Sequence, residues 1–149
     1  MTGHVILTIS GLQSSLVYAD AEEMYDPETA EISFTAHASY YYRNGKHYIL
    51  YEEIDEDTGE ITKSRIKISP DSIEVEKKGT VSSHMIFQEE RTHVSEYETP
   101  FGRFALGVES HGLKVLENDN RLDASIDYIL HINEAPMIEN HLKLTVEGK

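Results

Sequence analysis

Hydrophobic and polar residues alternate along much of this chain with a period of two, as in β-strands that bury one face. The alternation is longest at 121–133, where one face collects Leu122, Ala124, Ile126, Tyr128, Leu130 and Ile132. It recurs near the end of the chain, where Leu142, Leu144 and Val146 alternate with polar residues. One-sided strands are typical of antiparallel sheets, because central parallel strands are apolar on both faces.

Turn signals such as Asn44-Gly45 and Thr99-Pro100 divide the alternating stretches into ten short segments. The expected strands are 4–12, 31–42, 46–53, 60–69, 72–77, 83–88, 92–98, 101–116, 121–133 and 138–147. Asp20 and Glu23 fit a helix N-cap and its third-residue partner, so a short helical turn is expected near 20–26, before Pro27. The sequence therefore predicts an all-β meander with at most one helical turn.

The meander is expected to close into a barrel of about 8–10 strands, because closure hides the two edges of a sheet. The long segment 101–116 carries Gly102, Gly107 and Gly112 at five-residue spacing. Glycine within a strand commonly marks a bulge or a barrel corner, so these residues favour a bent barrel over a sandwich. No linker or repeat interrupts residues 1–149, which are read as a single domain.

The charge and composition of the chain exclude some classes of binding partner and some kinds of chemistry. The chain has 27 acidic and 13 basic residues, giving a net charge of −14, so nucleic acid and anionic membranes are not expected partners. There are no cysteines, which excludes disulfides and thiol chemistry. The first residues lack the pattern of a signal peptide or membrane span, so a cytoplasmic location is expected.

Tyrosine is the most distinctive residue type, with nine copies against four phenylalanines and no tryptophan. A tyrosine ring with its hydroxyl suits the wall of a half-polar cavity, although cross-strand pairing explains Tyr40, Tyr41, Tyr42 and Tyr48 equally well. Alternation places His47, Ile49, Tyr51 and Glu53 on one face of their strand, which would bring one carboxylate toward the interior. The eight histidines show no metal-binding spacing, so neither a metal nor a cofactor is expected.

Four short pieces of sequence carry a family resemblance. They are Tyr51-Glu52-Glu53, Ile66-Lys67-Ile68, the Ser83, Met85, Phe87 series, and Tyr97 followed by Thr99-Pro100 and Gly102. In order and spacing they resemble the YwiB-like family of small bacterial proteins of unknown function, over nearly the whole chain. The resemblance implies a calycin-like β-barrel, similar in architecture to lipocalins, and it brings no catalytic residues.

The leading functional hypothesis is a binding module for a small, partly apolar ligand inside the barrel. The expected lining residues are Tyr51, Glu53, Met85, Phe87, Tyr97 and Tyr128. Two alternatives stay open. One is an interaction domain with a filled barrel, whose acidic surface meets a basic protein; a homodimer in which strands of two copies pair is a separate possibility for the assembly. The other, less favoured, is an enzyme that uses Glu53 as an acid or base, for which the sequence supplies no companion residue.

Overall fold

A computed structural model describes residues 3–11, 33–54, 57–79, 82–100, 102–132 and 135–148. These residues form ten strands: β1 (Gly3–Ser10), β2 (Ser33–Arg43), β3 (Lys46–Ile54), β4 (Ile61–Ser69), β5 (Ser72–Lys78), β6 (Ser83–Gln88), β7 (Arg91–Thr99), β8 (Gly102–Asn118), β9 (Arg121–Ile132) and β10 (Ala135–Gly148). The predicted strands are confirmed, with ends displaced by at most a few residues. The helical turn expected near 20–26 lies outside the described residues.

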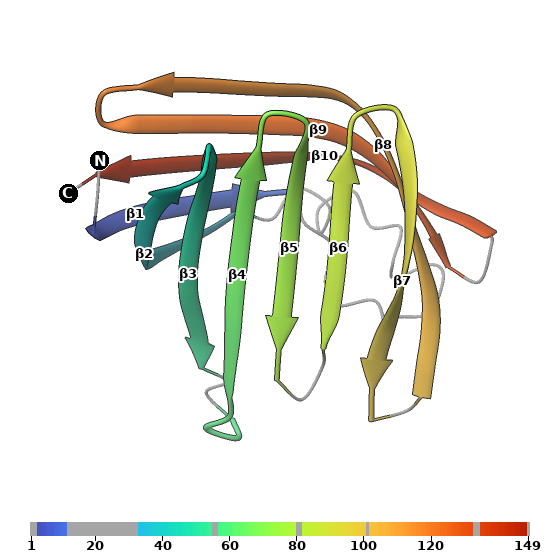
Figure 1. Ribbon diagram of the computed structural model, residues 1–149. Coiled ribbons are helices and arrows are strands. Elements are labelled where there is room, and N and C mark those ends of the chain that lie inside the picture. Colours follow the sequence, from blue (N-terminus) through green and yellow to red (C-terminus); the bar gives the residue numbers. More distant parts are fainter. Residues whose placement is uncertain are drawn as a thin grey trace.

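The strands form one antiparallel sheet in the order β6-β5-β4-β3-β2-β1-β10-β9-β8-β7, rolled into a nearly closed barrel. Figure 1 shows β3 to β6 side by side as one wall, with β8 to β10 crossing at a steep angle to them. The two ends of the chain meet in the sheet, because β1 pairs with β10 from Val5–Gly148 to Ser10–Lys143. Among the described residues, no helix is long and apolar enough to span a membrane.

Apolar side chains fill the barrel because each strand turns its apolar face inward. In β3 to β6, for example, Ile49, Ile66, Val75 and Met85 lie directly opposite one another and are almost fully buried. From the other wall, β9 contributes the predicted face that begins at Leu122. Burial of this apolar surface is the main stabilising contribution to the fold.

The two end strands of the sheet, β6 and β7, meet at a seam that backbone hydrogen bonds close only in part. A bridge joins Ser82 and Glu98 through two backbone hydrogen bonds of 3.0 Å each. Further along, the Ser95 hydroxyl donates to the backbone carbonyl of His84, and His93 Nε2 lies 2.5 Å from Gln88 Oε1. The barrel is therefore closed between β6 and β7 by one backbone bridge together with hydrogen bonds made by side chains.

Strand β8 bends at a bulge, as the glycine spacing predicted. The pairing of β8 with β9 shifts register between His111 and Lys114, and Gly112 within this bulge has a φ of +76°. The Glu89 carboxylate, from the turn between β6 and β7, accepts hydrogen bonds from the backbone N–H groups of Gly112 (3.0 Å) and Leu113. Those two bonds hold the bulge against the neighbouring turn.

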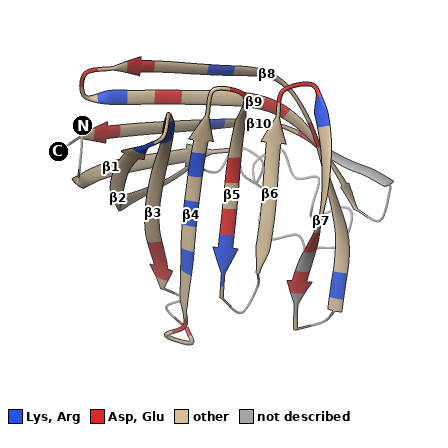
Figure 2. Cartoon of the chain, in the orientation of Figure 1, with Lys and Arg blue, Asp and Glu red and all other residues tan. Residues whose placement is uncertain are grey.

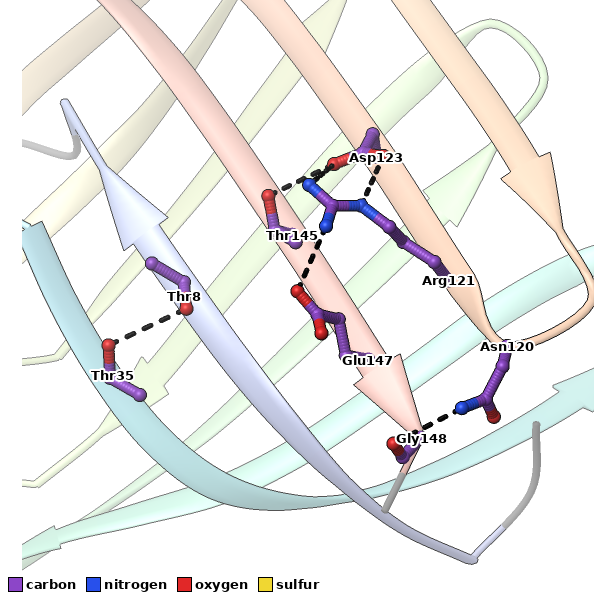
Figure 3. Close-up of polar contacts among 8 residues, drawn as sticks. All are labelled: Thr8, Thr35, Asn120, Arg121, Asp123, Thr145, Glu147 and Gly148. Carbon is purple, nitrogen blue, oxygen red and sulfur yellow. Dashed lines mark hydrogen bonds and ion pairs between the residues drawn. The ribbon is translucent and has the colours of Figure 1, made fainter.

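The outer wall carries the charged residues. Figure 2 shows basic residues along β4 beside acidic residues on β5, where Arg65 lies 3.6 Å from Glu74 and 4.0 Å from Glu76. On β9 and β10, the Arg121 guanidinium contacts Asp123 at 2.8 Å and Glu147 at 3.0 Å (Figure 3). Arg121 also holds the pKa of Asp123 below its ordinary value. These exposed charges are paired within the wall.

Candidate functional site

The inward-facing residues of β3 to β6 are mostly apolar, but one row of paired positions across these four strands is polar. Tyr51 lies opposite Ser64, Ser64 opposite Lys77, and Lys77 opposite Ser83, each on the next strand of the sheet. All four side chains point toward the inside of the barrel, on the same face of their strands as the neighbouring apolar row. We call these four residues the inner polar row.

The inner polar row is largely buried, and two of its hydroxyl groups contact each other. Tyr51 and Ser64 are each 4% exposed, and their hydroxyls have no hydrogen-bond partner among the described residues beyond this mutual contact. Burial raises the pKa of Tyr51 far above its ordinary value, and the nearby charge of Glu53 raises it further. The phenol therefore keeps its proton at neutral pH. A buried hydroxyl without a partner carries a desolvation penalty of about 1–3 kcal/mol, which the contact between Tyr51 and Ser64 reduces.

An ion pair flanks this row at the end of the barrel. Lys77 Nζ lies 2.9 Å from Glu53 Oε1, and the side chains of Lys77 and Glu53 are 14% and 37% exposed, respectively. The basic end of β5 and the acidic end of β3 lie at the same end of the barrel (Figure 2). Glu53 is therefore the inward glutamate, as the strand alternation indicated.

The barrel wall opens beside the inner polar row because β2 and β3 part. These strands pair only from Ser39–Leu50 to Arg43–Lys46, after which β2 continues on β1 and β3 continues on β4. A pocket of about 530 Å³ lies at this opening. It is lined by His4, His37, Ala38, Ser39, Leu50, Tyr51, Glu52, Ile54, Lys63 and Ser64. We call it the side pocket, and it shares Tyr51 and Ser64 with the inner polar row.

The other predicted lining residues lie elsewhere. Met85, Phe87 and Tyr128 are buried in the apolar core, where the Phe87 and Tyr128 rings meet edge to face at 4.9 Å. The Tyr128 hydroxyl donates to the carbonyl of Gly11. The backbone of Tyr97 lies opposite Phe104 on β8, and its side chain is outside the description. The structure thus places Tyr51 in the lining of the side pocket, whereas Glu53 and the three core residues are not part of that lining.

Two residues of this site, Ser64 and Lys77, were missed from the sequence, although each interrupts an apolar face. Ser64 shares its face with Ile66 and Ile68, and Lys77 shares its face with Ile73 and Val75. A polar residue at an apolar position of an alternating strand is the signal that could have found both.

A second titratable cluster joins β2, β3 and β8. His47 is 6% exposed, and its Nδ1 lies 2.7 Å from the Tyr40 hydroxyl, while its Nε2 lies 3.7 Å from a Glu117 carboxylate oxygen. Burial, followed by the Glu117 charge, raises the pKa of Tyr40, and the direction of its hydrogen bond with Nδ1 depends on the tautomer of the imidazole. Burial also lowers the pKa of His47.

The described residues contain no group of three or more His, Asp or Glu side chains placed to hold a metal ion. A second pocket, of about 350 Å³, lies beside the β8 bulge and includes Asp127 and Asn140. The side pocket is the larger of these two and has both polar and apolar residues in its lining, so it is the stronger candidate for ligand binding.

The fold and the pocket define a small all-β protein, a ten-stranded barrel with a half-polar opening in its wall. Residues 18–144 match the family described as "Domain of unknown function (DUF1934)", and the chain belongs to that family. It is 24% identical over 117 residues to the "Uncharacterized beta-barrel protein YwiB" of Bacillus subtilis (strain 168), covering 78% of this chain and 81% of that protein. The resemblance noted from the sequence is thereby confirmed.

The fold also matches a solved structure. The crystal structure of the ywiB protein from Bacillus subtilis superposes with a TM-score of 0.74 at 20% sequence identity, covering 99% of this chain and 92% of that chain. At this identity the likeness establishes the barrel fold and leaves function to be argued from the site.

Proposed function

We propose that this barrel binds a small, partly apolar molecule in the side pocket between β2 and β3. The observation that carries the proposal is a pocket of about 530 Å³ whose lining combines polar residues, such as Tyr51 and Ser64, with apolar surface. Apolar surface from Ala38 and Leu50 lines the same pocket. A ligand with one polar group and an apolar body would satisfy both kinds of surface.

Binding at the side of the barrel agrees with a packed interior. The core residues Met85, Phe87 and Tyr128 fill the interior, so the ligand would bind at the wall, where Tyr51 is part of the pocket lining. Tyr51 is thus the residue of the predicted lining set on which the proposal depends most.

The test is a screen by ligand-detected NMR, with a panel of small apolar molecules carrying a carboxylate, amide, alcohol or amine group. Tyr51→Phe is expected to weaken the binding of hits roughly tenfold, because it deletes one hydrogen bond to the ligand. The same change removes a buried hydroxyl whose contact is with Ser64, so the free energy of unfolding should change by no more than about 1 kcal/mol. Loss of binding without loss of stability identifies a functional hydroxyl.

Tyr48→Phe is the matched control, because Tyr48 stacks on Tyr41 at 4.7 Å in the β2–β3 hairpin and is absent from the lining of the side pocket. It should leave ligand binding unchanged. A panel without hits, or hits that bind Tyr51→Phe and wild type equally, would contradict the proposal and favour an interaction domain with a filled barrel.

A further inference from the structure

Strands β2 and β3 leave part of their backbone edges without a neighbouring strand. Their pairing covers only the part of the hairpin near its turn, and beyond it β2 pairs with β1 and β3 pairs with β4. Asn44 and Gly45 both have a positive φ, of 53° and 76°, which makes this turn type I′ and makes the flanking pair Arg43–Lys46 a hydrogen-bonded one. Because hydrogen-bonded pairs alternate with non-hydrogen-bonded pairs, every second residue of β3, counted from Lys46, directs its N–H and C=O toward β2.

The free edge of β3 lies at the side pocket. By this alternation, Glu52 and Ile54 are the residues beyond the last pair with β2 whose N–H and C=O groups face the gap. Among the described residues, neither backbone has a hydrogen-bond partner on that side. Both residues line the pocket, together with His37 from the free edge of β2. An unpaired strand edge is a template to which an extended chain can add by main-chain hydrogen bonds.

The side chains around this edge indicate what an added chain would carry. On the outer face, Ile54 is 66% exposed and favours an apolar neighbour, while the exposed carboxylate of Glu52 favours a basic one. Glu52 lies opposite Lys63 on β4, yet no ion pair joins them among the described residues. On the inner side, the Phe34 and Tyr51 rings meet at 5.6 Å, which leaves room for a small residue only. The net charge of −14 also favours the approach of a positively charged chain.

We infer that the ligand of the side pocket is a short extended peptide with a positive charge, which adds antiparallel to the free edge of β3. This inference rests on the proposed function and specifies its ligand class, because such a peptide combines polar amides with apolar side chains. Its backbone would exchange hydrogen bonds with Glu52 and Ile54, as in other cases of strand addition. The pocket volume of about 530 Å³ lies within the range of ligand sites.

The probe is the peptide N-acetyl-Val-Ala-Lys-amide, whose valine would lie opposite Ile54 and whose lysine would lie opposite Glu52. Its dissociation constant is measured by NMR titration of the full chain. N-methylation of the lysine amide should weaken binding roughly three- to tenfold, because it removes a hydrogen bond to the Glu52 carbonyl. N-methylation of the alanine amide, which points away from β3, is the matched control and should change the affinity by less than about twofold.

A proline substitution tests the same edge from the protein side. Ile54→Pro removes an N–H that faces the gap and leaves the ladder between β3 and β4 in place, because Ile54 and Ile61 form a pair without hydrogen bonds. It should weaken peptide binding roughly three- to tenfold. Ile61→Pro is the matched control, since the Ile61 N–H points away from the gap, and it should leave the affinity unchanged.

Hydrogen exchange reports strand addition directly in the unaltered protein. The bound peptide should slow exchange at the Glu52 and Ile54 amides, which it would protect. The Tyr51 and Glu53 amides already face β4 and should exchange as they do in the free protein. Replacing the peptide lysine with glutamate should weaken binding by at least roughly threefold, through repulsion from Glu52 and from the net negative charge.

The outcomes separate the two proposals. Unchanged affinity after N-methylation of the lysine amide, or unchanged exchange at Glu52 and Ile54, would overturn strand addition. Equal or tighter binding of the glutamate peptide would overturn the assignment of a positively charged ligand. If the peptides fail to bind while members of the small-molecule panel bind the side pocket, the peptide class falls and the ligand-binding barrel stands. Absence of binding by every peptide and every panel member would remove the proposed function itself.

Discussion

At the scale of single residues, Gly11 shows how closely the barrel strands approach one another. It follows β1 with a φ of +79°, and a Cβ atom added there would lie 1.7 Å from the backbone oxygen of His141. Gly45, in the β2–β3 turn, has a similar φ of +76°, but a Cβ atom there would meet nothing within 4 Å. The two glycines share a backbone conformation and differ in available space.

Alanine substitutions separate these two effects. Gly45→Ala should lower the free energy of unfolding by about 1–2 kcal/mol, the cost of a left-handed conformation for a residue with a Cβ atom. Gly11→Ala should lower it by more than about 4 kcal/mol, because β10 must also move away. Urea unfolding monitored by circular dichroism measures both values. If both variants lost the same free energy of unfolding, β10 would not lie as close to Gly11 as described.

Residue placement was predictable from the sequence where alternation decided it. The inward positions of Glu53, Met85 and Phe87 followed from parity alone, because neighbouring residues in a strand point to opposite faces. The pairing of Glu53 with Lys77 did not follow, since these residues are on strands separated by β4 and only the register brings them to the same end of the barrel. The contact between the Tyr51 and Ser64 hydroxyls is likewise a property of packing in three dimensions.

At the scale of elements, the β8 bulge and the turn between β6 and β7 depend on each other. Glu89 supplies both acceptors for the bulge N–H groups, and these bonds, led by that of Leu113, lower the pKa of the Glu89 carboxyl. The glycine spacing predicted a bend in β8. It did not indicate that the carboxylate of a glutamate more than 20 residues earlier would accept hydrogen bonds from the backbone at that bend. Sequence patterns locate irregular strands more readily than the groups that stabilise them.

Hydrogen exchange tests this link between the two elements. In Glu89→Gln, one carboxylate oxygen becomes an amide that cannot accept, so the N–H groups of Gly112 and Leu113 should exchange faster than in wild type at neutral pH. The wild-type protection should persist below the ordinary glutamate pKa, because the depressed pKa keeps Glu89 ionised there. Glu90→Gln is the control and should leave both amides unchanged. Unaltered exchange in Glu89→Gln would contradict the contact.

At the scale of the whole molecule, His47 connects the β2–β3 hairpin to β8 through Tyr40 and Glu117. Its folded-state pKa lies below the ordinary value of 6.5, so the unfolded chain binds a proton at a pH where the folded chain does not. The free energy of unfolding therefore falls as the pH drops through about 6.5, and the slope ends below the folded-state pKa. The contribution of neutral His47 is fully present above this window.

His47→Gln isolates this contribution. At pH 8 the variant should be less stable than wild type by about 1–3 kcal/mol, because Tyr40 loses its buried partner. This difference should shrink as the pH falls toward 5, at no more than about 1.4 kcal/mol per pH unit. His37→Gln, at an exposed position, is the matched control and should change the free energy of unfolding little at pH 8. Urea denaturation at several pH values provides the measurement, and a gap that widens on acidification would show the opposite sign.

The meeting of the two chain ends in the sheet has a kinetic consequence. Hairpins such as β8–β9 join residues that are close in sequence, whereas the β1–β10 ladder joins residues separated by nearly the whole chain, as in Val5–Gly148. Contacts of long sequence separation form slowly, because the intervening chain must be ordered or looped before they can form. The local hairpins can therefore form early, and the β1–β10 ladder is expected to set the rate at which the barrel folds.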